Sequence, residues 1–239
     1  MFPIADDNSE IRTVPYVNYA IIALNVIVFL LLQQLNSNES FDGAFSLVPR
    51  EVTTGVDLVG LTDVKDGAGK IIGQINQFTN PISVYVTFLS SIFMHSGFMH
   101  IFGNMLFLWI FGDNIENRIG HIRYAVFYLI VGFLATIAHV MTDTSSVIPT
   151  LGASGAISGV LGGYLLLFPN KQVKAIMFSF MMTTIPAFIA VGLWIGYQVV
   201  MGYMNSGSHG GGVAYAAHIG GFVAGLALIK FFALGTKAE

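Results

Sequence analysis

Residues 144–170 read TSSVIPTLGASGAISGVLGGYLLLFPN, a run of 27 residues without a charged side chain. A helix needs about 20 apolar residues to cross the hydrocarbon core of a bilayer, so this stretch is long enough to lie in a membrane. Glycines recur in it at positions 155, 159 and 163, which places them on one face of a helix. In lipid, such a row lets a second helix backbone approach closely. The stretch therefore predicts a membrane helix with a partner packed along its glycine face.

The whole chain has the composition of a membrane protein. Among its 239 residues, 10% are charged and 54% are apolar, whereas a soluble domain carries about 25% charged residues. The chain holds no cysteine, which excludes a disulfide scaffold, a Cys-ligated zinc site and a thiol nucleophile. With a net charge of −3 and no basic run, nucleic acid is not expected as a partner.

Four other charge-free windows predict five further spans. The windows cover residues 13–38, 71–112, about 125–142 and 175–229, and the last is long enough for two helices separated by the Gly-rich stretch 205–212. We expect an all-α membrane protein: a six-helix bundle with a long, partly ordered outer loop between its first two helices. It forms a single domain over residues 1–239, with spans at about 16–35, 95–113, 123–142, 153–169, 175–203 and 213–234.

The distribution of basic residues predicts the orientation. An even number of spans places both termini on one side, and seven of the ten Lys and Arg residues share that side in this assignment: Arg12, Arg118, Arg123, Lys171, Lys174, Lys230 and Lys237. Basic residues are enriched in cytoplasmic loops, so we expect both termini in the cytoplasm and the long loop outside. The first span lacks a small-residue cleavage site, which indicates a retained anchor.

Four uncharged polar side chains interrupt the apolar spans. His100 and Asn104 lie on the second span, Ser154 begins the fourth, and His218 lies on the sixth. In the predicted topology all four fall at similar depth in the outer half of the bilayer, where polar groups are costly and usually mark function. A serine hydroxyl needs an adjacent base to become a nucleophile, and a histidine can be that base. Candidate oxyanion donors are the side chains of His100 and Asn104, spaced i and i+4, and the Ser154 amide.

Three motifs together resemble the rhomboid intramembrane serine proteases. They are Gly152-Ala-Ser154-Gly155, His95-x4-His100-x3-Asn104 and Ala217-His218-x2-Gly221-x3-Gly225. The resemblance covers about residues 85–230 and is to the basic six-span bacterial form. It implies a bundle with a water-filled cavity open to the outer side, in a multi-pass protein of the bacterial inner membrane. It also implies a serine endopeptidase that cleaves transmembrane-protein substrates.

The resemblance assigns a role to each candidate residue. Ser154 is implied as the nucleophile and His218 as the general base. His100, Asn104 and the Ser154 backbone N–H are implied as the oxyanion hole. Supporting positions are Gly152, Gly155 and His95. No cofactor, metal or obligatory protein partner is expected beyond the substrate and the membrane lipid.

The chain departs from the commoner family pattern at two places. Val86 and Thr87 stand where many members carry a Trp-Arg pair in the outer loop. Ser158 stands where several members carry a Tyr that stacks beneath the histidine. We therefore expect the anchoring of the loop and the packing of the His218 ring to differ from that pattern.

Two other functions remain open from the residues alone. A small membrane transporter could use buried His, Asn and Ser side chains along an ion path, although the two halves of the chain show no self-similarity of the inverted-repeat kind. A non-catalytic rhomboid-like protein that binds transmembrane clients is the second alternative, although such proteins typically lack the Ser or the His that this chain keeps. Taken singly, Ser154 reads as a helix cap and the histidines and Asn104 as interhelical hydrogen-bonding groups.

Overall fold

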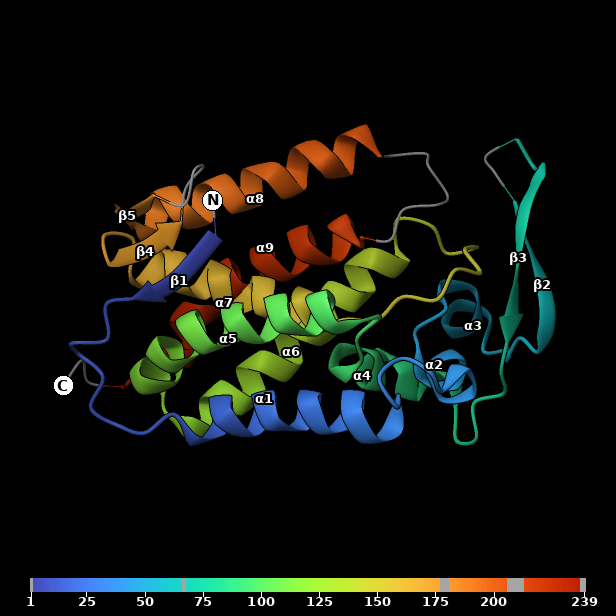
Figure 1. The fold of residues 1–239 in the computed structure, drawn as a ribbon, viewed down its shortest axis with the longest axis horizontal. Coiled ribbons are helices and arrows are strands. Elements are labelled where there is room, and N and C mark those ends of the chain that lie inside the picture. Colours follow the sequence, from blue (N-terminus) through green and yellow to red (C-terminus); the bar gives the residue numbers. More distant parts are fainter. Residues whose placement is uncertain (1, 66–67, 177–180, 206–212, 237–239) are drawn as a thin grey trace.

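A bundle of helices forms the centre of the protein, with a small β-sheet at one end and a β-hairpin at the other (Figure 1). This computed structural model describes residues 2–65, 68–176, 181–205 and 213–236. The loop predicted at 205–212 lies outside the described residues from position 206 onward, as does Lys237. The bundle consists of α1 (Tyr16–Ile27) with a π-helical turn at Val28–Leu32, α5 (Phe98–Ile119), α6 (His121–Val140), α7 (Ser154–Leu167), α8 (Ala187–Met204) and α9 (Tyr215–Phe232).

Helices occupy each predicted span, but not all of them have the length of a full crossing. Among the described residues, α6, α8 and α9 are long and apolar enough to cross a membrane. A fourth span results if α5 is counted together with the helical segment Val84–Phe93, from which it is bent by 75°. The apolar helices Tyr16–Leu32 and α7 are shorter. The structure thus supports a helical membrane bundle with three or four spanning helices, and the predicted count of six full spans is not confirmed.

The chain is mostly helical as predicted, but it also contains strands, and the fifth predicted span does not begin at residue 175. Strands β1 (Phe2–Asp6), β4 (Gln172–Ile176) and β5 (Met182–Pro186) form an antiparallel sheet in the order β1-β4-β5. The helix α8 begins only after Pro186. Exposed and buried residues alternate along β4, as in a half-buried strand. The number of charged and apolar residues in a window does not show whether they repeat with the period of a strand or of a helix. The composition therefore does not predict these strands.

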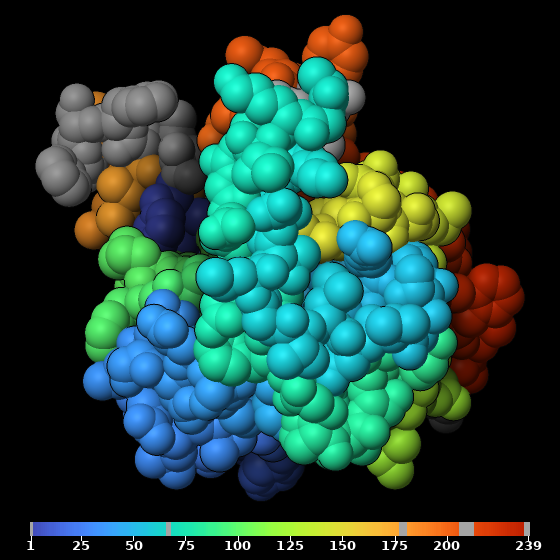
Figure 2. All heavy atoms as spheres, turned by 90° about the vertical axis from the view of Figure 1, so that its right-hand side faces the viewer, coloured from blue at the N-terminus to red at the C-terminus, as the bar shows by residue number. Residues whose placement is uncertain are grey.

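The segment between α1 and α5 is folded and supports the approach to α7. It contains α2 (Glu39–Phe45), α3 (Pro49–Thr54), the hairpin of β2 (Gly60–Lys65) and β3 (Ile71–Gln77), and α4 (Thr87–Ser90) between two 3-10 turns. Seen from this end of the molecule, the hairpin runs across the middle of the face (Figure 2). Leu47 exchanges backbone hydrogen bonds with Thr150, and Gln77 donates to the Val147 carbonyl. The loop before Ser154 is therefore held by hydrogen bonds from the segment between α1 and α5.

Both ends of the chain lie toward the opposite side of the molecule from the hairpin (Figure 1), and Arg118 and Arg123 bond to the C-terminal residues there. Arg118 donates to Thr236, and Arg123 donates to the carbonyls of Phe232 and Leu234. Glu116 accepts from the first backbone N–H groups of α1 at 2.9 and 2.7 Å, which caps that helix. Two of the seven basic side chains predicted to share one side of the membrane, Arg118 and Arg123, thus lie beside the C-terminal residues 232–236.

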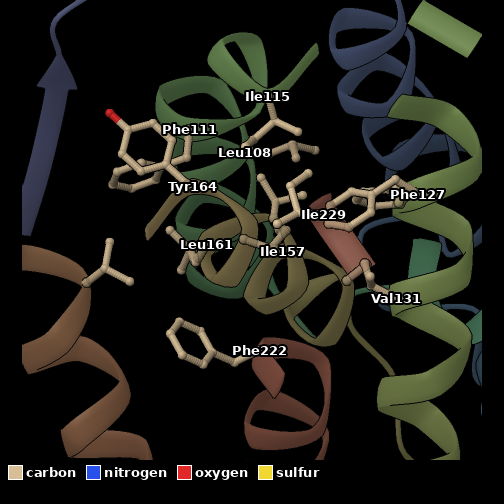
Figure 3. Close-up of a cluster of buried hydrophobic side chains, with 14 of the residues drawn as sticks. Leu108, Phe111, Ile115, Phe127, Val131, Ile157, Leu161, Tyr164, Phe222 and Ile229 are labelled. Carbon is tan, nitrogen blue, oxygen red and sulfur yellow. The ribbon is translucent and has the colours of Figure 1, made fainter. Parts of the chain in front are cut away.

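Helix α7 lies at the centre of the core. Ile157, Leu161 and Tyr164 pack against residues of α5, α6 and α9 (Figure 3). The contact with α9 is made by backbones: a Cβ atom built on Gly221 would lie 2.1 Å from the Gly155 carbonyl oxygen, and one on Gly225 would lie 2.0 Å from that of Gly159. The close approach predicted from the glycine rows is confirmed.

Replacement of Gly225 by Ala should separate α7 from α9. The added methyl group meets backbone atoms that cannot move aside, so we expect a loss of about 1–3 kcal/mol in the free energy of unfolding. The measurement is thermal unfolding of the detergent-purified protein by circular dichroism. Gly192→Ala is the matched control, because nothing lies within 4 Å of a Cβ at that position on α8. Equal melting temperatures for the two variants would contradict the packing described here.

A buried polar cluster fastens β1 to the bundle. The Asp6 carboxylate accepts from the Tyr164 hydroxyl at 2.6 Å and from Asn114 Nδ2 at 2.8 Å, and Lys171 also bonds to Asn114. Burial raises the pKa of Asp6 from its ordinary 3.8 to about 7, and Asp113 adds to the effect while Tyr164 and Lys171 oppose it. Between these two pH values the folded chain keeps a proton that the unfolded chain has lost, so stability falls as the pH rises toward 7.

The docking of β1 should therefore weaken between pH 6 and pH 8, by about 1 kcal/mol. Hydrogen–deuterium exchange of the β1 and β4 amides, corrected for intrinsic rates, measures this change. Asp6→Asn keeps an acceptor for Tyr164 but does not titrate, so its exchange should change less between pH 6 and pH 8 than that of the wild type. Asp7→Asn is the control, because that neighbouring side chain is exposed. A wild-type strand with equal protection at both pH values would refute the prediction.

Candidate active site

Ser154 and His218 lie within hydrogen-bond distance of one another. Ser154 is the first residue of α7 and His218 lies in the first turn of α9, and the Ser154 Oγ is 2.7 Å from the His218 Nε2. The serine is partly exposed, whereas the histidine is buried at 8% exposure. Proton transfer from a hydroxyl to an imidazole requires this separation. The structure thus brings together the two residues that the sequence places 64 positions apart.

The position of Ser154 follows from the length of α7. This helix has 14 residues, about 21 Å at 1.5 Å per residue, and is shorter than the hydrocarbon core of a bilayer, about 30 Å. Its first turn is buried within the bundle and directly follows the loop that Leu47 and Gln77 hold at Thr150 and Val147. The backbone N–H groups of a first helical turn have no partner within the helix, so the Ser154 amide is a donor at the same spot.

Gly152 allows the His100 ring to approach the serine. Its φ is +137°, and a Cβ there would lie 2.9 Å from His100 Nε2 and 3.5 Å from Ser154 Oγ. A side chain at this position would therefore be strained and would also collide with the imidazole. His100 Nδ1 accepts from the Ser96 backbone N–H at 3.4 Å and lies 3.0 Å from the Ser96 hydroxyl. In the neutral ring the proton is then on Nε2, which is turned toward Gly152.

Asn104 carries a donor without a partner. It lies one turn after His100 on α5 and is 8% exposed. Its Nδ2 atom is buried and makes no hydrogen bond within the described residues. A buried amide group without a partner costs roughly 1–3 kcal/mol, so its retention calls for a functional explanation. A carbonyl oxygen that becomes an oxyanion would satisfy it.

The two remaining supporting residues lie behind these groups. Gly155 allows the close approach of α6, since a Cβ there would lie 2.8 Å from the Ala135 Cβ, whereas the Ala217 Cβ of α9 would be at an ordinary contact distance of 3.6 Å. His95 is fully buried, and its ring meets the His100 ring edge-on with centroids 5.1 Å apart. Its backbone is held by Gln33, which accepts from the His95 N–H at 2.8 Å and donates to the His95 carbonyl at 2.9 Å. The backbone of His95 is therefore fixed, while both of its ring nitrogens are buried without a hydrogen-bond partner within the described residues.

Comparison with known protein families identifies the family of the chain. The family model described as the rhomboid domain matches residues 83–234 of the chain, which include each side chain described above except Gln33, Leu47 and Gln77. The chain belongs to the rhomboid family. Its members include proteases, so a serine protease activity is supported at the level of the family.

Relatives of this rhomboid come from bacteria, fungi and plants. Rhomboid protease GluP of Bacillus subtilis is 36% identical over 140 residues, which cover 59% of this rhomboid and 25% of GluP. Rhomboid protein 1, mitochondrial, of Saccharomyces cerevisiae is 30% identical over 159 residues, or 64% and 42% of the two chains. RHOMBOID-like protein 1 of Arabidopsis thaliana is 27% identical over 223 residues, or 90% and 52%. This rhomboid matches about half the length of these relatives or less.

At the positions that depart from the commoner rhomboid pattern, the polar side chains make hydrogen bonds to nearby backbone carbonyls. Thr87 is buried and donates its hydroxyl to the Val84 carbonyl, while Val86 is partly exposed. The Ser90 hydroxyl donates to the Phe45 carbonyl at 2.7 Å, so the segment is tied to α2 near its end. Ser158 bonds to the Ser154 carbonyl on its own helix at 2.6 Å and offers no ring to His218.

Sequence reasoning missed three residues that contact the His218 ring. The Trp194 ring lies 6.0 Å from it between centroids, and the Tyr215 ring meets it edge-on at 6.4 Å. The Gln198 Oε1 lies 2.8 Å from His218 Nδ1. One signal was available for Gln198, because it is the one polar side chain in the apolar run 187–200. Nothing in the spacing of the two aromatic residues indicated their contact with His218.

Proposed function

We propose that this rhomboid is an intramembrane serine endopeptidase that cleaves a peptide bond in or near a transmembrane segment of its substrate. The observation that supports this proposal is the 2.7 Å contact between Ser154 Oγ and His218 Nε2, beside two candidate oxyanion donors. The relatives of this rhomboid include a protein described as a rhomboid protease. A small transporter or a client-binding protein would not require a base at hydrogen-bond distance from a serine.

In the proposed reaction, the Ser154 hydroxyl passes its proton to His218 Nε2 while Oγ attacks the substrate carbonyl carbon. The carbonyl oxygen becomes an oxyanion that accepts hydrogen bonds from His100 Nε2, Asn104 Nδ2 and the Ser154 amide. The His218 imidazolium then gives its proton to the leaving nitrogen, and the peptide C–N bond breaks. Water hydrolyses the acyl-enzyme by the same steps in the same order, with His218 as base and then as acid.

We further propose that residues 1–239 form one membrane domain with six spans, both termini in the cytoplasm and the active site open to the outer face. The position of Arg118 and Arg123 beside the C-terminal residues supports this orientation. The serine lies at the start of α7, away from that end. A bacterial inner membrane is the proposed location, and a transmembrane substrate must unwind locally to present its carbonyl at that depth.

Loss of either member of the dyad should abolish cleavage. With detergent-purified protein and a model transmembrane substrate, Ser154→Ala and His218→Ala should each lower kcat by about 10⁶-fold, to below detection. A fluorophosphonate should modify Ser154 in the wild-type chain and nothing in Ser154→Ala. Cleavage that survives Ser154→Ala would refute the mechanism. Ion flux in proteoliposomes, combined with an unreactive Ser154, would instead establish the transporter alternative.

Asn104→Ala tests the oxyanion donors. Because this side chain is proposed to bind the oxygen after charge has developed on it, kcat should fall about 10²–10³-fold with little change in KM. Steady-state cleavage of the same substrate measures both constants. The variant should melt no lower than the wild type, since Nδ2 makes no bond within the described residues. A wild-type kcat in a folded Asn104→Ala protein would exclude this role.

A further inference from the structure

Gln198 extends the dyad onto a third helix. Its Oε1 lies 2.8 Å from His218 Nδ1, so both ring nitrogens of His218 are engaged within the described residues, one by Ser154 and the other by Gln198. The glutamine is 7% exposed, whereas its neighbours Tyr197 and Val199 are 57% and 49% exposed. The side chain therefore points inward from α8 at the place where the histidine stands.

The orientation of this amide decides which ring nitrogen of His218 carries the proton. Neutral imidazole holds one proton, and only an unprotonated Nε2 can receive the proton of Ser154. When the Gln198 carbonyl oxygen accepts from Nδ1–H, the proton lies on Nδ1 and Nε2 is free to act as the base. If the amide NH₂ faced the ring, the proton would move to Nε2 and the serine could not be activated.

We propose that Gln198 is a positioning residue that holds His218 in its Nδ1–H tautomer and fixes the direction of its ring. This inference rests on the proposed function of the Ser154–His218 pair. A neutral amide performs here the orienting task for which other serine hydrolases use a carboxylate.

The position of Gln198 on α8 supports a role beyond packing. The other buried residues of this helix, Ala187, Ala190 and Val191, are small and apolar. Burial of an amide costs free energy unless it finds a partner, and an apolar side chain would fill the same space at less cost. The partner that the glutamine finds is the catalytic candidate itself.

Gln198→Met and Gln198→Glu provide the decisive comparison. Methionine has a similar length and keeps the packing but cannot accept the Nδ1 proton, whereas glutamate retains the acceptor. In cleavage of a model transmembrane substrate, we expect Gln198→Met to lower kcat about 10-fold with KM unchanged. Gln198→Glu should restore most of that loss. The rate at which a fluorophosphonate modifies Ser154 should follow the same order, because this small probe does not depend on substrate unwinding.

Val191→Ala is the matched control on the same buried face of α8. It removes packing without touching the His218 ring, so it should lower the melting temperature and leave kcat and the labelling rate close to wild type. ¹⁵N NMR of histidine-labelled protein, with the His218 signals assigned through His218→Ala, should show a protonated Nδ1 in the wild type. In Gln198→Met the tautomers should be mixed.

The outcomes separate this inference from the proposed function. A Gln198→Met protein that cleaves at the wild-type rate, with Nδ1 still protonated, would overturn the role of Gln198 and leave the dyad intact. A wild-type protein that neither cleaves nor reacts with the probe would overturn the proposed function. In that case the NMR comparison still decides whether Gln198 sets the tautomer. Equal losses in Gln198→Met and Gln198→Glu would also overturn the inference, since glutamate keeps the acceptor.

Discussion

The backbone contact between α7 and α9 is the constraint on which the rest of the site depends. A serine side chain is short, so a histidine on another helix can reach its oxygen only if the two backbones nearly touch. Gly155 and Gly159 on α7 face Gly221 and Gly225 on α9, with room for no Cβ atom at either of the latter positions. The same approach places His218 opposite Ser154 and lets the helices share van der Waals contact along their length.

The groups around this contact are arranged in pairs of a reactive side chain and a neighbour that orients it. The Ser96 N–H donates to His100 Nδ1, so the ring proton of neutral His100 is on Nε2. Gly152 has no Cβ that would collide with this nitrogen. Gln198 Oε1 lies 2.8 Å from His218 Nδ1, from which we propose that it accepts the ring proton. Buried polar groups in a low-dielectric interior are stable when they are hydrogen-bonded. Within the described residues, Asn104 Nδ2 is a buried donor near the serine that has no hydrogen-bond partner.

Much of this arrangement was predictable from residue order, and particular errors have particular causes. The glycine rows and the four polar side chains were identified because each is conspicuous in an apolar background, and the structure brings Ser154, His218 and His100 to one place. The charge-free run from residue 175 predicts a helix over the end of β4 and the whole of β5, because the absence of charges does not distinguish a strand from a helix. Gln33, Trp194 and Tyr215 act through contacts with distant segments, which spacing along the chain does not encode.

The amino-acid sequence by itself determined that this is a membrane protein and that it resembles the rhomboids. It also determined which helices carry the candidate dyad. These properties depend on composition and on local spacing, which a linear chain displays directly. Only the tertiary structure decided that α7 is short and central, that a sheet joins the N-terminal strand to residues 172–186, and that Gln198 meets His218. Each of these depends on which surfaces meet after folding, because hydrogen-bond direction and backbone separation are properties of pairs of segments.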